Sequence, residues 1–416
     1  SILLFVAAIA AAIIANSPVA PVYQEFLLHE LHLQIGNFNL LSHGGENLRM
    51  IEFINDGLMT IFFLLVGLLV GELSSFRKAA LPFIAACGGM LFPVIVYMSI
   101  CPPGSAGSQG LAIPMATDIA FSLGVLSLLG SRVPLSLKIF LTAFAVVDDI
   151  GGILVIALFY SSHVSYGYIL IAALLYVLLY FIGKRGTTNK IFFLVIGVVI
   201  WYLFLQSGIH STISGVILAF VIPAKPRLDV GKYIEHIRHT IAGFPVVESG
   251  SIVLTNEQIA KLKEVESASD RVISPLQSLE DNLHGAVNYL ILPLFAFVNA
   301  GVVFSGSGEL VGSVGMAVAA GLLFGKFAGI YFFTWLAIKI KLTPMPPGMT
   351  WKNLSGIALL GGIGFTVSLF IANLSFGANY PVLLNQAKFG VLSGTILSGL
   401  LGYIVLRIVL PVRKRK

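Results

Sequence analysis

The stretch "TAFAVVDDIGGILVIALFY", residues 142–160, is an apolar run in which two adjacent residues, Asp148 and Asp149, are charged. Its length allows a helix to cross the roughly 30 Å hydrocarbon core of a bilayer. A charge at the bilayer centre costs at least about 2.5 kcal/mol on insertion scales, so two neighbouring acids need a functional reason. The stretch therefore predicts a transmembrane helix with ionisable groups at membrane depth.

The composition extends this prediction to the whole chain. Hydrophobic residues make up 57% of the 416 residues and charged residues 11%, whereas soluble domains hold about 25% charged residues. Long apolar runs recur without the ten-residue alternation of barrel strands, so we expect an all-α integral membrane protein surrounded by lipid. The formal charge of +6 does not indicate nucleic acid, because most basic residues lie in short loops. Cys87 and Cys101 lack metal-ligand spacing, and no cofactor is expected.

We expect twelve transmembrane helices. The predicted spans cover residues 1–16, 53–72, 80–100, 111–130, 135–160, 166–183, 188–206, 208–222, 285–304, 311–338, 353–375 and 384–410. Alternate loops hold the Lys and Arg residues, while "CPPGSAGSQG", "SSHVSYG" and "QSG" have none. The positive-inside rule then places both termini in the cytoplasm of a multi-pass protein. The first run starts at Ser1 without an initiator Met, so we expect further sequence before it.

The chain divides into two blocks of spans and a polar insertion. Residues 1–223 hold spans one to eight, with an outward-facing connection at 17–52 that is either a hairpin or a surface helix. Residues 284–416 hold the other four spans and a basic tail. Residues 224–283 form a cytoplasmic loop insertion, which is either a plain connection or a regulatory module. In it, "FPVVESGSIVL" predicts two short strands and "TNEQIAKLKEVESA" a helix that Thr255 caps.

Two predicted spans are interrupted. "LAIPMATDIAFSLG", residues 111–124, contains Pro114, and "LLGGIGFTVSLFI", residues 359–371, contains three glycines before Thr366. Proline and clustered glycine weaken a helix, and a bilayer tolerates such breaks only where protein or a watery cavity surrounds them. Each break lies in the middle span of three. Matching breaks in two halves indicate an inverted-repeat transporter with its site at the midplane.

The charged residues within the spans form a candidate ion site. Asp148 and Asp149 point about 100° apart on a helix, so they address different partners. We expect one to pair with Lys326 and the other to face a cavity beside Asp118. Carboxylates, the Thr117 hydroxyl and freed backbone carbonyls are hard ligands that suit a small alkali cation. Burial and neighbouring carboxylates raise the pKa of a carboxylic acid in general, so protons are expected to compete for this site.

Each candidate also has a structural alternative. Asp148 and Asp149 could cap a broken helix, Asp118 could satisfy exposed backbone amides, and Lys326 could be a fixed counter-charge. Other ionisable residues are possible pH-responsive groups, although His210 is more typical of a hydrogen-bonded structural histidine and Glu280 and His284 of interface residues. These candidates are Glu72, His210, Glu280 and His284.

At these residues the chain resembles the NhaA family of bacterial sodium/proton antiporters, an inverted-repeat family. The resemblance covers nearly all of the chain apart from residues 224–279. It depends on the segments "AIPMATDIAFSLGVLSLLGSRVPLSLKIFLTAFAVVDDIGG", "SGIHSTISGVILAF", "NYLILPLFAFVNAG", "GLLFGKFAGI" and "GGIGFTVSLFIA".

The resemblance implies a transporter and not an enzyme. Asp149 would be the main cation-binding carboxylate, Asp148 its partner in ion and proton exchange, and Lys326 the partner of Asp148. Thr117 and Asp118 would lie where two unwound segments cross. The family exchanges Na⁺ or Li⁺ for a larger number of H⁺ and is electrogenic, active at alkaline pH and commonly homodimeric. Residues 17–52 would be the dimer contact, in a bacterial cytoplasmic membrane.

Two features depart from the family pattern. The family follows "FFLLVGL" with a short charged run, whereas here Leu68 leads directly into "LVGELSSF". That run belongs to the pH-response region, and we do not assign its role to Glu72. The insertion at 224–283 is the other departure, since compact members connect these spans more briefly.

Three other functions stay open at this stage. A sodium-coupled symporter of the same architecture would need a roomy polar pocket for an organic solute, and no organic substrate is expected here. An intramembrane aspartyl protease would need two facing aspartates that share a proton. Asp118 and Asp148 could imitate that pair, but no Gly-x-Gly-Asp motif occurs. A passive channel would conduct without proton coupling.

Overall fold

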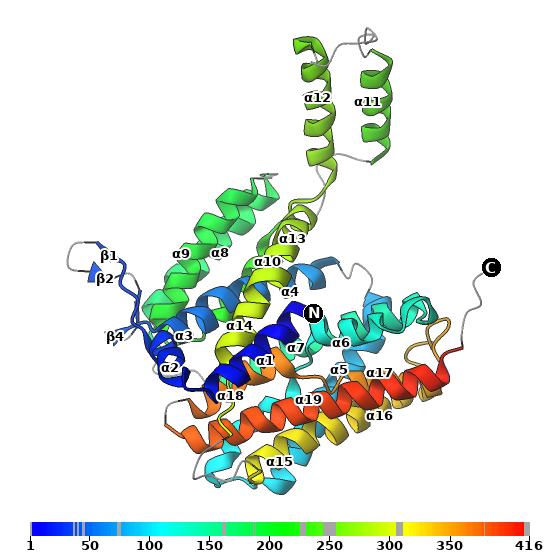
Figure 1. Ribbon diagram of the computed structural model, residues 1–416. Helices are drawn as coiled ribbons and strands as arrows, with labels where there is room; N and C mark the ends of the chain where they lie inside the picture. Colours follow the sequence, from blue (N-terminus) through cyan, green and yellow to red (C-terminus); the bar gives the residue numbers. More distant parts are fainter. Residues whose placement is uncertain are drawn as a thin grey trace.

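A computed structural model shows a helical bundle (Figure 1). It describes residues 2–411 except 36–37, 40, 44–45, 73–75, 160–163, 186, 188, 225–229, 244–254, 305–310 and 378. Among the described residues, seven helices are long and apolar enough to cross a membrane, or up to ten if each of three bent helix pairs is one span. The chain is therefore a multi-pass helical membrane protein, as the composition predicts.

The first half of the chain contains the following elements, in which η marks 3₁₀- and π-helices. They are α1 (Ile2–Ala15), α2 (Ala20–Leu28), β1 (Gln34–Ile35), β2 (Phe38–Asn39), β3 (Ser42–His43), β4 (Glu46–Asn47), α3 (Met50–Glu52), η1 (Phe53–Leu58), α4 (Met59–Glu72), α5 (Phe76–Ile100), η2 (Ala106–Gly110), η3 (Ile113–Met115), α6 (Ile119–Ser127), η4 (Gly130–Arg132), α7 (Leu135–Phe159), α8 (Tyr166–Lys184), α9 (Lys190–Ser207) and α10 (Thr212–Val221).

The second half is helical where the structure describes it. Its elements are α11 (Val230–Ala242), α12 (Asn256–Val272), α13 (Pro275–Ala286), η5 (Val287–Ile291), α14 (Leu292–Asn299), α15 (Ser313–Ala320), η6 (Gly321–Gly325), α16 (Lys326–Lys339), α17 (Trp351–Leu360), α18 (Phe365–Phe376) and α19 (Pro381–Val409).

The connection at 17–52, for which the sequence predicts either a hairpin or a surface helix, contains a short helix and two hairpins. Helix α2 turns away from α1 by 114°, and two short antiparallel hairpins follow it. β1 pairs with β2 through Gln34 and Asn39, and β3 pairs with β4 through Ser42 and Asn47. These two-residue strands are a small exception to the all-α prediction, and they lie at one edge of the molecule (Figure 1).

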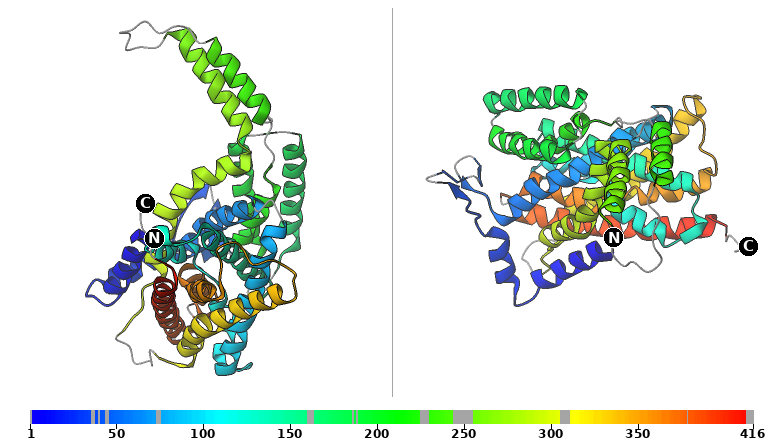
Figure 2. Two further views of the ribbon diagram at one scale, coloured as in Figure 1. Left: turned by 90° about the vertical axis from the view of Figure 1, so that its right-hand side faces the viewer. Right: turned by 90° about the horizontal axis from the view of Figure 1, so that it is seen from above.

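The polar insertion contains a helical hairpin that projects from the bundle in the views of Figures 1 and 2. Its helices α11 and α12 lie side by side, and His236 lies 3.6 Å from Glu264 between them. Thr255 caps α12 as predicted, since its hydroxyl accepts a hydrogen bond from the Gln258 amide at 3.3 Å. The predicted strands at 244–254 lie outside the described residues.

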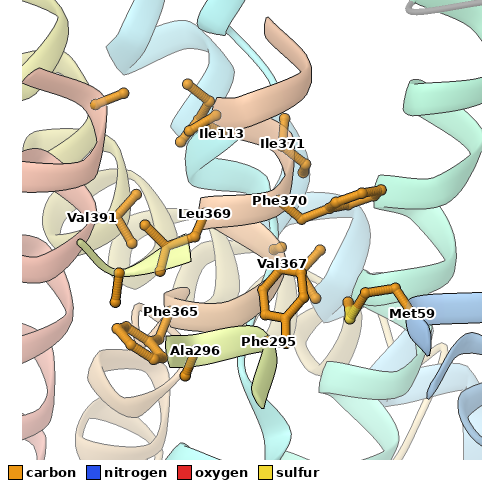
Figure 3. Packing of buried hydrophobic residues seen from close by; sticks show 14 of the residues in the cluster. Met59, Ile113, Phe295, Ala296, Phe365, Val367, Leu369, Phe370, Ile371 and Val391 are labelled. Carbon is orange, nitrogen blue, oxygen red and sulfur yellow. The ribbon is translucent and has the colours of Figure 1, made fainter. Parts of the chain in front are cut away.

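The core of the bundle surrounds α18. This helix is mostly apolar and is buried on nearly every side, and Phe365, Val367, Leu369 and Phe370 are all at most 2% exposed. Figure 3 shows these side chains packed among residues of α14, η3, α4 and α19. A helix that is hydrophobic all round is typical of a buried position. The half of the second broken span that follows the glycines is therefore enclosed by protein.

Candidate functional site

Both predicted interruptions are breaks in the structure. The segment Ala106–Met115 meets α6 at a bend of 47°, and α17 meets α18 at a bend of 44°. Pro114 is the second residue of η3, and this short helix ends one residue later at Met115. Residues 116–118 between the two halves are not helical, and neither are residues 361–364 of the second span.

The two breaks lie against each other. The Asp118 amide donates to the Ile363 carbonyl at 2.6 Å, and the Thr117 hydroxyl donates to the Gly361 carbonyl at 2.6 Å. Gly364 allows this approach, because a Cβ atom there would lie only 2.8 Å from the Ala116 carbonyl oxygen. Backbone groups freed by one break are thus partly satisfied by the other, as a membrane interior requires.

Asp118 compensates the ends of two half-helices. One carboxylate oxygen accepts from the Phe121 amide of α6 at 2.9 Å. The other accepts from the Thr366 amide at 3.1 Å and the Thr366 hydroxyl at 2.8 Å, in the first turn of α18. A carboxylate at a helix N-terminus satisfies exposed amides and offsets the helix dipole. This geometry matches the structural alternative for Asp118.

Lys326 forms a buried ion pair with Asp148. Both side chains are 0% exposed. The Lys326 ammonium also donates to the Met115 carbonyl and to the Thr117 hydroxyl, the latter at 3.0 Å. Lys326 follows directly after the π-helix η6, and π-bulges are frequent at functional sites. The ammonium therefore links α7 to the first break.

Asp149 differs from its neighbours because its carboxylate interacts with the Thr117 backbone amide without forming a regular hydrogen bond. It is 0% exposed, and neither of its carboxylate oxygens has a hydrogen-bond partner among the described residues. The second oxygen of Asp148 is also without a partner there. An isolated buried carboxylate is costly unless it is protonated or pairs with a cation. The arrangement thus leaves hard oxygen ligands free at the end of a buried ion pair.

The predicted ligands do not form a ready cage of carboxylates. Within the described part of the chain, no group of three His, Cys, Asp or Glu side chains could hold a metal ion. The Asp118 oxygens are occupied by the two helix ends, so Asp118 is placed as a neighbour of the site. Any transported cation would rely on Asp149 and Asp148 together with hydroxyl, carbonyl or water oxygens.

His210 lies apart from the breaks. Its Nδ1 atom is 3.5 Å from an Asp56 carboxylate oxygen, without hydrogen-bond geometry, and its ring meets the edge of Phe370 at 5.9 Å. The backbone carbonyl of Asp56 accepts from Trp201 at 3.0 Å and from Ser211 at 3.2 Å. This arrangement suits a structural histidine beside an acid.

Of the other possible pH-responsive residues, His284 lines a cavity and Glu280 lies one turn before it on α13. His284 lines a cavity of about 660 Å³ with Phe62, Ile119 and Asn288, and its ring nitrogen lies 2.9 Å from the Asn288 amide. Glu280 precedes His284 by one turn on α13 and is partly buried. The side chain of Glu72 lies outside the described residues.

Sequence reasoning missed several polar residues at the breaks. Ser122 donates to the Leu360 carbonyl at 3.0 Å, and Ser368 donates to the Ile113 carbonyl at 2.6 Å. Both serines lie in the first turn of a half-helix, as Thr366 does. A hydroxyl just after a helix break in an otherwise apolar segment is the signal that could have identified them.

These features define a class of protein: a multi-pass membrane transporter with two broken helices and buried ionisable groups where they meet. The family follows from sequence comparison. A family described as "Na+/H+ antiporter 1" matches residues 1–406, and the chain belongs to it. The predicted resemblance is therefore confirmed, and the family is one of transporters and not of enzymes.

Curated relatives agree over nearly the whole chain. A protein of Bacteroides thetaiotaomicron is 98% identical, covering 100% of this chain and 96% of the relative. One from Bacteroides fragilis is 80% identical with the same coverage. One from Psychrobacter cryohalolentis is 42% identical over 98% of this chain and 91% of the relative. All three are named "Na(+)/H(+) antiporter NhaA".

The alignment with the first relative extends over 422 positions, more than the 416 residues of this chain. That relative therefore has residues at positions where this chain has a gap. A charged run missing after Leu68 would produce a gap of this kind.

Proposed function

We propose that the protein is an electrogenic antiporter that exports Na⁺ or Li⁺ in exchange for H⁺ by alternating access. Support comes from family membership and from one observation above all. Asp149 is a fully buried carboxylate whose two oxygens have no hydrogen-bond partner among the described residues. We infer that such a group binds either a proton or a metal cation, so that the two ions compete for it.

The other charges at the site are already compensated. Lys326 neutralises Asp148, and two helix ends with the Thr366 hydroxyl compensate Asp118. Asp149 is therefore the primary ligand of the cation, and the free oxygen of Asp148 and the Thr117 hydroxyl complete its surroundings. Asp148 and Lys326 couple the ion to protons, because a change in the protonation of either one alters the charge beside Asp149.

The proposed cycle alternates between two cavities, neither of which is lined by Asp148 or Asp149. One, of about 660 Å³, lies between α4, α6 and η5, and the other, of about 580 Å³, lies beside α2, η1 and α19. Asp148 and Asp149 are 0% exposed, so the site is occluded in this structure. Protons that arrive from outside displace Na⁺ outward, and deprotonation toward the cytoplasm lets Na⁺ bind again.

The proposed topology retains twelve spans in a bacterial inner membrane, with both termini in the cytoplasm. Seven of these spans are the long helices and three are the bent helix pairs. The two others are the ten-residue α10 and the continuous helical stretch from α13 to α14. The positive-inside rule supports the orientation. In this orientation the cavity of about 580 Å³ opens to the outside of the cell. Residues 17–52 lie on the same side, and we propose them as the homodimer contact. The insertion at 224–283 faces the cytoplasm.

The rival functions fit the site less well. An aspartyl protease needs two aspartates that share a proton across a water-accessible cleft, but Asp118 is held by helix ends and Asp148 by Lys326. A symporter needs room for an organic solute beside the ion, but the carboxylates at this site are fully buried. The direct test measures ΔpH in everted vesicles after addition of Na⁺, Li⁺ or K⁺ across a pH series. Proton release with Na⁺ and Li⁺ only is expected, and no Na⁺-dependent signal at any pH would refute the proposal.

A further inference from the structure

Three asparagine side chains link the broken helix α18 to two other elements. Asn55 of η1 and Asn299 of α14 exchange amide hydrogen bonds at 3.2 and 2.8 Å. The Asn299 oxygen also accepts from the Asn373 amide of α18 at 2.7 Å. Asn299 is 0% exposed and Asn55 is 8% exposed. Amides in an apolar core are placed only where partners satisfy them, so this series fixes the relative position of three elements.

The series holds the end of α18 that is remote from the ion site. At the near end, Thr366 donates to Asp118 through its amide and its hydroxyl. At the far end, Asn373 donates to Asn299 and to the Leu369 carbonyl, the latter at 3.0 Å. The side chains between these ends are almost all apolar and resist sliding only through packing shape. Directional contacts at both ends therefore determine where α18 lies.

The far contacts can be exchanged for water. Asn55 and Asn373 line the cavity of about 580 Å³ that also includes Tyr23, Asn385 and Lys388. An amide beside such a cavity can replace a protein partner by water, so the net cost of breaking the bond is small. Asn299 is fully buried and retains its bond to the Phe295 carbonyl at 2.9 Å. The series can thus open on the cavity side and close again.

We propose that Asn55, Asn299 and Asn373 are positioning residues that hold α18 in the occluded geometry and set how often the site opens toward this cavity. They act through α18 and do not touch the ion. The inference rests on the alternating access proposed above. Loss of the Asn373 bond should favour the state that is open to the outer cavity, because the far end of α18 is then restrained by packing alone.

The test uses a buried reporter on α18. Val367 is 0% exposed, and Val367→Cys is placed in a background in which Cys87 and Cys101 are replaced by Ser. Right-side-out vesicles are labelled with a membrane-impermeant maleimide. In Asn373→Leu, the reporter should react about fivefold faster, which corresponds to about 1 kcal/mol for one neutral hydrogen bond at 1.4 kcal/mol per factor of ten.

Asn385→Leu is the matched control. Asn385 lines the same cavity, but among the described residues its side chain bonds only to the Val303 backbone, at 3.0 and 2.8 Å. Its substitution should leave the labelling rate of Val367→Cys unchanged. Equal acceleration in both variants would show a general loosening of the cavity and would overturn the proposal.

A second pair of measurements separates this inference from the proposed function. Asn373→Ser retains a hydroxyl donor. In this variant the Val367→Cys reporter should label faster than with Asn373 unchanged and more slowly than with Asn373→Leu. If Asn373→Leu does not fold, Asn373→Ala serves in its place with the same expectation, because it also removes the bond to Asn299. Unchanged labelling in a folded variant with normal Na⁺-dependent ΔpH would refute the positioning role alone. Absence of Na⁺-dependent ΔpH in the unmutated chain would instead refute the proposed function.

Discussion

The aspartate at the helix break, Asp118, and the aspartate in a continuous helix, Asp149, differ in how many hydrogen bonds their carboxylates accept. Both carboxylates are buried, at 3% and 0% exposed. Asp118 accepts three hydrogen bonds from the first turns of two half-helices, whereas the Asp149 oxygens accept none from the described residues. The first charge is matched by the fold itself, and in the proposed mechanism the second pairs with a mobile ion.

This difference separates structural charge from functional charge in one site. A carboxylate whose partners are backbone amides cannot give them up without leaving those amides unsatisfied in the membrane. A carboxylate without fixed partners can exchange one cation for another. The comparison predicts that substitutions at the two positions differ in kind, one reducing stability and the other abolishing exchange.

Asp149→Asn should have the largest effect on transport. The amide cannot release a proton, so Na⁺-dependent proton movement in everted vesicles should fall to the background level. Thermal unfolding in detergent should not shift downward, because the substitution removes an unmatched buried charge. Exchange at the full rate in this variant would contradict the assignment of Asp149.

Lys326→Ala should have the largest effect on stability. Removal of one partner of a buried ion pair costs about 3–5 kcal/mol, because the other charge is left uncompensated. We expect a clear drop in the midpoint of thermal unfolding and altered proton coupling, with a smaller change in Na⁺ affinity. Lys326→Ala with Asp148→Asn should recover part of the stability. Lost Na⁺ binding with intact coupling would count against the assigned pair.

Asp118→Asn should destabilise the protein by about 1–3 kcal/mol, since at least one helix-end amide or the Thr366 hydroxyl loses its acceptor. Thermal unfolding of purified protein measures this change. The same substitution at Asp149 is the control, because there it should cause no loss. A stable Asp118→Asn protein without exchange would place Asp118 among the ion ligands instead.

Thr366→Val should have the smallest effect. It removes the hydroxyl bond to Asp118 but retains the backbone bond, so a loss of about 1 kcal/mol is expected. Ser127→Ala is a suitable control, because within the described part of the chain the Ser127 hydroxyl bonds only to the Gly124 carbonyl of its own helix, at 2.6 Å. If the two variants unfold at the same temperature, the Thr366 hydroxyl does not stabilise the junction.

Most of the spans could be predicted because apolar length alone determines them. The predicted span at 135–160 is α7 at Leu135–Phe159, and the one at 166–183 is α8 at Tyr166–Lys184. Both breaks were also predictable, since Pro114 and the glycines at 361, 362 and 364 weaken a helix wherever it packs. The start of the span predicted at 285–304 was less accurate. The continuous helical stretch begins earlier, at Pro275, in a polar segment that hydropathy does not identify as helical.

The site could be predicted only in part. Charge balance in a membrane brings Lys326 to an aspartate, and the ion pair with Asp148 follows that expectation. Nothing local shows that Asp118 caps α18, because its contact with Thr366 joins residues 248 apart in the chain. The link between Asn55 and Asn299 spans 244 residues and depends on tertiary packing in the same way.

The central claim is that Na⁺ and H⁺ exclude each other at Asp149. Binding of radioactive Na⁺ to purified protein, measured across a pH series, tests it most directly. If one proton competes, the apparent dissociation constant should rise about tenfold for each pH unit below the titration of the site. Asp149→Asn should show no specific binding. Binding that is independent of pH, or that persists in this variant, would contradict the account.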